Sequence, residues 1–166
     1  MSILYIMCGV GFSGKSTLAK KISEIKHAEL VSQDGMFFEN EKELNLDLND
    51  GAQWRMLLDM CKKKIYENLE AGKSVVFDNT NTRFEHREEL REFVKPLVVK
   101  TKVVFLDTPL EVQKERQRNN LVTKERHDVK QEYLDEARKE LEVPGENENT
   151  VIYKPGENMD NFVRSL

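Results

Sequence analysis

The sequence predicts an α/β fold in which a parallel sheet of five strands lies between two layers of helices. Short apolar runs alternate along the chain with segments of helical periodicity, which is typical of βαβ units. The runs are apolar throughout, as expected of strands that helices cover on both faces. The predicted strands are Ile3–Cys8, Ala28–Val31, Ser74–Asp78, Val103–Leu106 and Val151–Tyr153.

Apolar residues at helical spacing predict the helices between these strands. The clearest helix is 53–71, because one apolar stripe runs along it and Gly72 follows at the position of a C-cap. Thr82 is predicted to cap the helix that begins near Arg83, and Pro109 fits the first position of the next helix. The predicted helices are 16–26, 53–71, 83–95, 110–118, 129–141 and 158–166. Residues 36–50 are expected to be a loop with one helical turn, and Asn119 and Asn120 are expected to end the helix before them.

A glycine-rich stretch joins the first predicted strand to the first helix. Its spacing, Gly-x-x-x-x-Gly-Lys-Ser, is the Walker A pattern in the strand–loop–helix context that the pattern requires. Successive N–H groups of such a loop form a concave site for phosphate oxygens. Lys15 is expected to neutralise the β- and γ-phosphates of ATP, and the Ser16 hydroxyl is expected to ligate Mg²⁺. The predicted ATP-binding residues of the loop are Gly9, Gly11, Ser13, Gly14, Lys15, Ser16 and Thr17.

Length and composition favour one domain over residues 1–166. The net charge of −4 argues against binding nucleic acid or acidic membranes through the whole surface, but it leaves room for a local basic groove. The apolar run at 3–8 is too short to span a membrane and is expected to be a core strand. Cys8 and Cys61 have no metal-ligand spacing, which favours a reducing, cytoplasmic location, with Cys8 as a small buried residue.

Three aspartates, Asp34, Asp78 and Asp107, each follow a predicted strand. Ligands of parallel sheets bind at the carboxyl ends of the strands, so these acids predict an acidic site facing an ATP–Mg²⁺ complex. Asp78 ends an apolar strand, as a Walker B acid does, and is expected to hold Mg²⁺ directly or through water. Asp34 is expected to accept the proton of an attacking hydroxyl. The alternative for Asp34 is an Asx turn with Gly35.

Residues 114–130 carry an excess of positive charge in a chain that is acidic overall. One interpretation is a solvated helix face. The other, which we favour, is an arginine-containing lid that closes over the transferring phosphoryl group, where a cation lowers the barrier. The cations are Lys114, Arg116, Arg118, Lys124, Arg126 and Lys130. His27, His86 and His127 lack metal-ligand spacing and are expected to lie at the surface.

Taken in order, these motifs resemble the group of P-loop kinases that contains the polynucleotide 5′-kinases, and zeta toxins and small predicted kinases are similar. The motifs are Gly9–Thr17, Ser32–Asp34, Asp78–Asn81, Arg87, and Asp107–Pro109 with Arg116. The resemblance covers nearly the whole chain and implies a P-loop NTPase sandwich with a lid. It implies that Lys15, Asp34 and Arg116 are catalytic, with Asp34 as the general base. It also implies an acceptor site formed by Asp34, Thr80, Asn81 and Arg87, although Arg87 has no firm role.

One position departs from that group. The lid of the group often carries a second arginine four residues after the first, and Asn120 stands there in this chain. Arg118 and Arg126 are the candidates to replace that arginine, and both are predicted to bind ATP.

The leading hypothesis from the sequence is an ATP-dependent kinase that phosphorylates a hydroxyl, above all the 5′-OH of a DNA or RNA end. The basic residues of 114–130, with Arg83, Arg87 and Arg91, are the cations available for a polynucleotide groove. Phe37 and Phe38 are candidates to stack on the terminal base. The alternatives are a small-molecule or nucleotide-sugar kinase of the zeta-toxin kind, and a nucleotide-binding switch whose NTP hydrolysis drives a partner.

Overall fold

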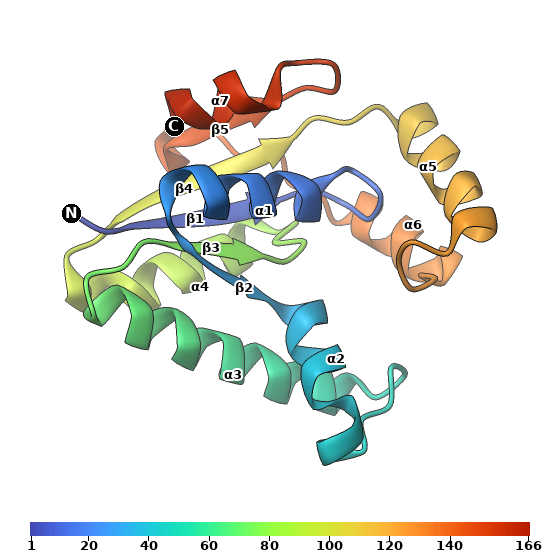
Figure 1. The fold of residues 1–166 in the computed structure, drawn as a ribbon, viewed down its shortest axis with the longest axis horizontal. Coiled ribbons are helices and arrows are strands. Elements are labelled where there is room, and N and C mark those ends of the chain that lie inside the picture. The colour runs from blue at the N-terminus through green and yellow to red at the C-terminus, as the bar shows by residue number, and fades with distance from the viewer.

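The structure, a computed structural model, describes residues 1–166, and a parallel sheet of five strands lies at its centre (Figure 1). The strands are β1 (Ile3–Cys8), β2 (Glu29–Ser32), β3 (Val75–Asp78), β4 (Lys100–Leu106) and β5 (Thr150–Tyr153). Their order in the sheet is β2-β3-β1-β4-β5, and every neighbouring pair is parallel. The predicted α/β sandwich is therefore confirmed.

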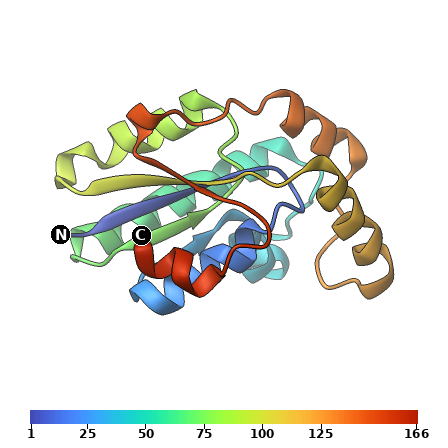
Figure 2. The same ribbon diagram turned by 90° about the horizontal axis from the view of Figure 1, so that it is seen from above.

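Helices cover both faces of this sheet, as Figures 1 and 2 show. The helices that pack on the two faces are α1 (Lys15–Lys26) and α7 (Met159–Ser165) on one, and α3 (Gly51–Glu70) and α4 (Phe84–Val94) on the other. Successive residues of β1 alternate between two apolar cores, because side chains of a strand point to opposite faces. Tyr5 and Met7 belong to the core under α1, whereas Leu4 and Ile6 belong to the core under α3. Both cores need apolar residues from β1, which explains why that strand is apolar throughout.

Residues 33–44 form a helix, α2 (Gln33–Leu44), so the predicted loop at 36–50 is wrong in its first part. The Ser32 hydroxyl accepts a hydrogen bond from the N–H of Gly35 and caps this helix. The Asx turn considered for Asp34 is therefore wrong. Phe37 is buried and its ring stacks on Trp54 of α3, with centroids 5.1 Å apart. Packing on α3 stabilises a helix whose own sequence has too few apolar residues to show the helical period.

The helix α5 (Leu110–Thr123) continues through Asn119 and Asn120, so the predicted break there is wrong. Asn120 is buried in the last turn of this helix, and its side-chain amide binds the segment that follows. Two predicted caps are each displaced by one residue. Arg83 rather than Thr82 is the N-cap of α4, and Pro109 is the N-cap of α5 rather than its first residue.

Helices α5 and α6 (Gln131–Lys139) stand out from one end of the sheet (Figure 1). Residues 124–130 join them and are called the α5–α6 connector below. Two short 3₁₀ helices, η1 (Lys95–Leu97) and η2 (Glu146–Glu148), complete the elements. None of the helices combines the length and apolar composition that crossing a membrane would require.

Candidate active site

The P-loop, residues 9–14, leaves the end of β1 and leads directly into α1. The N–H of Gly9 donates to the carbonyl of Thr80 at 3.0 Å, which ties the loop to the segment after β3. Gly14 has φ of 100°, and a Cβ there would lie 3.1 Å from Nη1 of Arg116. A Cβ on Gly11 would lie only 2.4 Å from Cδ2 of Leu134 in α6. The glycines therefore allow α5 and α6 to approach the loop closely.

Side chains from α5 and from the segment between β4 and α5 hold the carbonyl groups of the loop. Thr108 Oγ1 donates to the carbonyl of Ser13 at 2.9 Å, and Arg116 Nη1 donates to the same carbonyl at 2.8 Å. Arg116 Nη1 also donates to the carbonyl of Phe12 at 3.2 Å. The N–H groups in the first turn of α1 have no intrahelical partner, so they remain available to an anion.

Lys15 and Asp78 form the charged centre of the site. Lys15 is buried, and its Nζ donates to the carbonyl of Val10 at 2.9 Å. Burial lowers the pKa of Lys15, and the charge of Asp78 opposes that shift. Burial likewise raises the pKa of Asp78, against the effects of Lys15 and of a hydrogen bond with Ser16. Asp78 and Ser16 present carboxylate and hydroxyl oxygens, the kind of ligand that Mg²⁺ takes in proteins.

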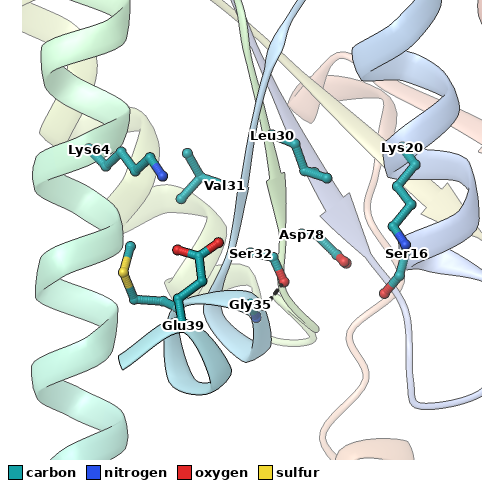
Figure 3. A pocket seen from close by; sticks show the side chains of 10 residues that line it. Ser16, Lys20, Leu30, Val31, Ser32, Gly35, Glu39, Lys64 and Asp78 are labelled. Carbon is teal, nitrogen blue, oxygen red and sulfur yellow. Dashed lines mark hydrogen bonds between the residues drawn. The ribbon is translucent and has the colours of Figure 1, made fainter. Parts of the chain in front are cut away.

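A cavity of about 300 Å³ opens beside this pair (Figure 3). Ser16 and Lys20 line it from α1, and the side chain of Asp78 points toward Ser16. Glu39 of α2 and Lys64 of α3 line the cavity from the opposite side. Hydroxyl and charged side chains line part of the cavity, which has room for the water molecules that Mg²⁺ usually retains in its coordination shell.

A second cleft, of about 1220 Å³, runs along the P-loop. Lys15, Ser16 and Thr17 line it together with the end of α5, the α5–α6 connector and the segment from Tyr153 to Gly156. Asp34 and Phe38 of α2 line the same cleft. Small-molecule sites usually measure about 300–1000 Å³, so this cleft has room for a nucleotide and a second reactant.

Arg126 of the connector extends over the P-loop. Its guanidinium carbon lies 4.5 Å from the centre of the Phe12 ring, and Phe12 adopts φ of 61°, which is rare for a bulky residue. The buried Nε of Arg126 has no hydrogen-bond acceptor. Asn120 holds the Arg126 backbone on both sides, because its Oδ1 accepts from the N–H at 3.0 Å and its Nδ2 donates to the carbonyl at 3.1 Å. Asn120, which stands where the resembled group often has an arginine, therefore orients a different arginine, Arg126.

The connector also contacts α2 and the loop that follows it. Nε2 of His127 lies 3.7 Å from Oδ2 of Asp34, and its ring centroid lies 5.1 Å from that of Phe38. Lys130 Nζ donates to Asn49 Oδ1 at 2.7 Å. His127 was expected at the surface, but it lies in the cleft against Asp34.

The structure contradicts the prediction that Arg87 binds the acceptor. Arg87 is 0% exposed and makes a two-point ion pair with Glu148, at 2.8 Å and 3.0 Å. Its Nη1 donates to the carbonyls of Asn81 and Thr82, at 2.9 Å and 3.0 Å. Every nitrogen of Arg87 therefore has a protein acceptor, and no part of it reaches the cleft.

Other predicted site residues lie elsewhere or contribute through their backbone. Asn81 is buried and its Nδ2 donates to the carbonyl of Met7 at 2.9 Å, so its side chain supports β1 instead of facing an acceptor. Thr80 contributes its carbonyl to Gly9 of the P-loop. Asp107 and Arg118 are exposed and line neither cleft, which corrects their predicted places in the acidic site and in ATP binding.

The sequence assigned no task in the site to four residues: Phe12, Thr108, Asn120 and His127. A signal existed for Asn120, because the sequence departs there from the pattern that it resembles. Phe12 and Thr108 stand inside quoted motifs, but no local signal gave either a task, because their contacts come from segments about a hundred residues apart.

Comparisons with known structures agree with this fold. A candidate kinase from Chloroflexus aurantiacus superposes with a TM-score of 0.76 at 16% identity, covering 99% of this chain and 93% of its own. The APS kinase of Mycobacterium tuberculosis, solved with AMPPNP and APS, gives 0.68 at 18% identity, with 99% and 94% covered. A gluconokinase from Sinorhizobium meliloti gives 0.65 at 23% identity, with 98% and 87% covered. The fold is therefore that of the P-loop kinases.

The sequence also matches a family. The model of the AAA domain family matches residues 4–144, which is most of the chain. The protein therefore belongs to this AAA domain family. None of the curated proteins compared with it gives a significant match.

Proposed function

We propose that residues 1–166 act as one kinase domain that transfers the γ-phosphate of ATP to a hydroxyl of a small molecule. The observation that supports this most strongly is that one cleft brings together Lys15, Ser16, Asp34 and Arg126. Phosphoryl transfer requires a cation at the phosphates, a metal and a group that orients the nucleophile. The proposal gives each of these four residues one such task.

Lys15 and the N–H groups at the start of α1 hold the β- and γ-phosphates. Arg126 approaches the transferring group, because its guanidinium lies over the P-loop and its Nε has no protein acceptor. Arg116 is bound to the loop carbonyls of Phe12 and Ser13, so we assign it to nucleotide binding and to support of the loop rather than to contact with the transferring group. Helix α5, the connector and α6 together form the lid.

Asp34 takes the proton of the acceptor hydroxyl. The acceptor oxygen forms a bond to the γ-phosphorus, the bond from that phosphorus to the β,γ-bridging oxygen breaks, and ADP leaves. Ser16 and Asp78 would hold a Mg²⁺ ion through their hydroxyl and carboxylate oxygens. When bound, that ion supplies neutralisation of the charge on the β- and γ-phosphate oxygens.

A small acceptor suits the structure better than a polynucleotide. Three of the cations expected to form a nucleic-acid groove, those in and next to α4, are already paired with carboxylates. Arg83 pairs with Glu140, Arg87 is buried with Glu148, and Arg91 bonds to both Glu88 and Glu148. Phe37 is buried, so only Phe38 remains to contact a base. The structural neighbours named as a gluconokinase and an APS kinase also favour a small acceptor.

The test is an assay with γ-labelled ATP and Mg²⁺ in which the position of the label is followed. The acceptors are a sugar acid such as gluconate, APS, a 5′-OH oligonucleotide, and water alone. We expect label on a small acceptor and none after Lys15→Ala, with an unchanged circular dichroism spectrum. Transfer to the oligonucleotide alone would restore the polynucleotide hypothesis, and release of free phosphate without transfer would favour the nucleotide switch.

A further inference from the structure

We propose that His127 is a positioning residue through which the lid orients the base Asp34. This inference rests on the proposed function, because it takes Asp34 as the residue that accepts the acceptor proton. His127 reaches Asp34 from a segment that is far away in the sequence, and nothing in the sequence pattern marked it for this task.

The contact involves one face of α2. Asp34 and Phe38 are four residues apart on this helix, so their side chains lie on the same side of it. The imidazole of His127 meets both, with Nε2 at 3.7 Å from Asp34 Oδ2 and its ring 5.1 Å from the Phe38 ring. The side chain of His127 is 24% exposed, whereas that of Asp34 is 50% exposed. His127 therefore covers one side of the carboxylate and leaves the other side open to the cleft.

Asp34 has no other side-chain partner that could fix its orientation. Its carboxylate accepts no hydrogen bond from any donor, and the capping of α2 is done by Ser32. An exposed carboxylate on the first turn of a helix rotates freely in water. A ring against one carboxylate oxygen restricts that rotation, so the other oxygen can face the acceptor hydroxyl.

Two consecutive residues of the connector lie at the two parts of the site, the P-loop and the base Asp34. Arg126 lies over the P-loop, and His127 lies against the base. Asn120 holds the Arg126 backbone through two hydrogen bonds, and Lys130 bonds to Asn49 at 2.7 Å beyond His127. A single position of the connector therefore places Arg126 over the P-loop and His127 against Asp34 at the same time. Proton removal is then efficient only when the lid is closed over ATP.

Kinetics provide the first test. His127→Ala should lower kcat for transfer to the acceptor found in the labelled-ATP assay by about tenfold, with the KM for ATP unchanged. His127→Gln, which keeps a nitrogen near the position of Nε2, should restore most of that loss. In the residual activity of Asp34→Asn, His127→Ala should cost nothing further, because residues that act through one another are not additive. The matched control is His86→Ala, an exposed histidine of α4.

Hydrogen exchange provides the second test and needs no acceptor. With AMPPNP and Mg²⁺ bound, Asp34→Ala should speed amide exchange in residues 124–130 by about threefold or more, because the contact on α2 is lost. Unchanged exchange there would overturn the inference, as would an unchanged kcat in His127→Ala or an equal loss in the Asp34→Asn background. If instead the wild type phosphorylates no acceptor, the proposed function fails, and the exchange measurement still decides whether His127 and Asp34 are in contact.

Discussion

Arg87 and Arg126 both lie beside the P-loop region, but their guanidinium groups have opposite surroundings. All three nitrogens of Arg87 donate to protein acceptors, and the side chain is fully buried. Arg126 stacks on Phe12, and its buried Nε has no acceptor. A buried donor without a partner costs about 1–3 kcal/mol, which an anionic ligand can recover. From this comparison we infer that a free donor, rather than the residue type or its place in a motif, marks an arginine that can serve a ligand instead of the fold.

The largest effect is expected from Arg126→Ala. If Arg126 contacts the transferring phosphoryl group, kcat should fall by about 10³-fold, while the midpoint of thermal unfolding does not fall. Arg126→Lys should recover little, because lysine keeps the charge but not the planar group that stacks on Phe12. Transfer of label from ATP measures the rate.

The control for that prediction is Arg118→Ala, which removes an exposed lid arginine outside the cleft. It should leave kcat unchanged. A large loss in Arg118→Ala together with a normal rate in Arg126→Ala would reverse the assignment.

Arg87→Met should act on stability instead. Leaving Glu148 buried without its main partner is expected to cost about 3–5 kcal/mol of the free energy of unfolding, measured by urea denaturation. Arg87→Met combined with Glu148→Leu should recover most of that loss, since an apolar pair of similar volume can replace a buried ion pair. A stable Arg87→Met variant with impaired acceptor binding would instead support the role that the sequence suggested.

Asn120→Ala tests a side chain that has both a structural and a functional consequence. Asn120 holds the Arg126 backbone, and so it places the guanidinium that we propose contacts the phosphates. Removing its two hydrogen bonds to Arg126 should lower kcat by about tenfold through misplacement of the guanidinium. Asn120→Asp keeps the acceptor for the Arg126 N–H and should lose less activity. An effect on stability without any effect on kcat would show that Asn120 supports the fold alone.

The smallest expected effect is a pH dependence of stability. Burial by itself raises the pKa of Glu148, but hydrogen bonds from Arg87 and Arg91 outweigh burial and leave that pKa below its ordinary value. The stabilisation is therefore complete above the unfolded-state pKa of about 4.3 and is lost as the pH falls toward the folded-state pKa. Below about pH 4.3 the wild type should lose up to about 1.4 kcal/mol per pH unit relative to Glu148→Gln, as measured by urea denaturation. Parallel curves for the two proteins would contradict this.

The sequence by itself determined the sheet, the P-loop and the acids at the ends of β2 and β3. Those features depend on local patterns, namely apolar runs, glycine spacing and the residues next to them, which are read within about ten positions. The sequence could not reveal α2 as a helix, because its stability comes from the packing of Phe37 on Trp54 of another helix.

Only the tertiary structure decided which arginine is buried, which one lies over the P-loop, and that His127 meets Asp34. Arg87 and Glu148 are 61 residues apart, and Thr108 reaches the carbonyl of Ser13 from 95 residues away. Whether a polar side chain has a hydrogen-bond or ion-pair partner depends on residues that folding brings together across such distances. A local pattern therefore predicts that a cation is present in a segment, whereas the partners supplied by folding determine whether that cation is free to bind a ligand.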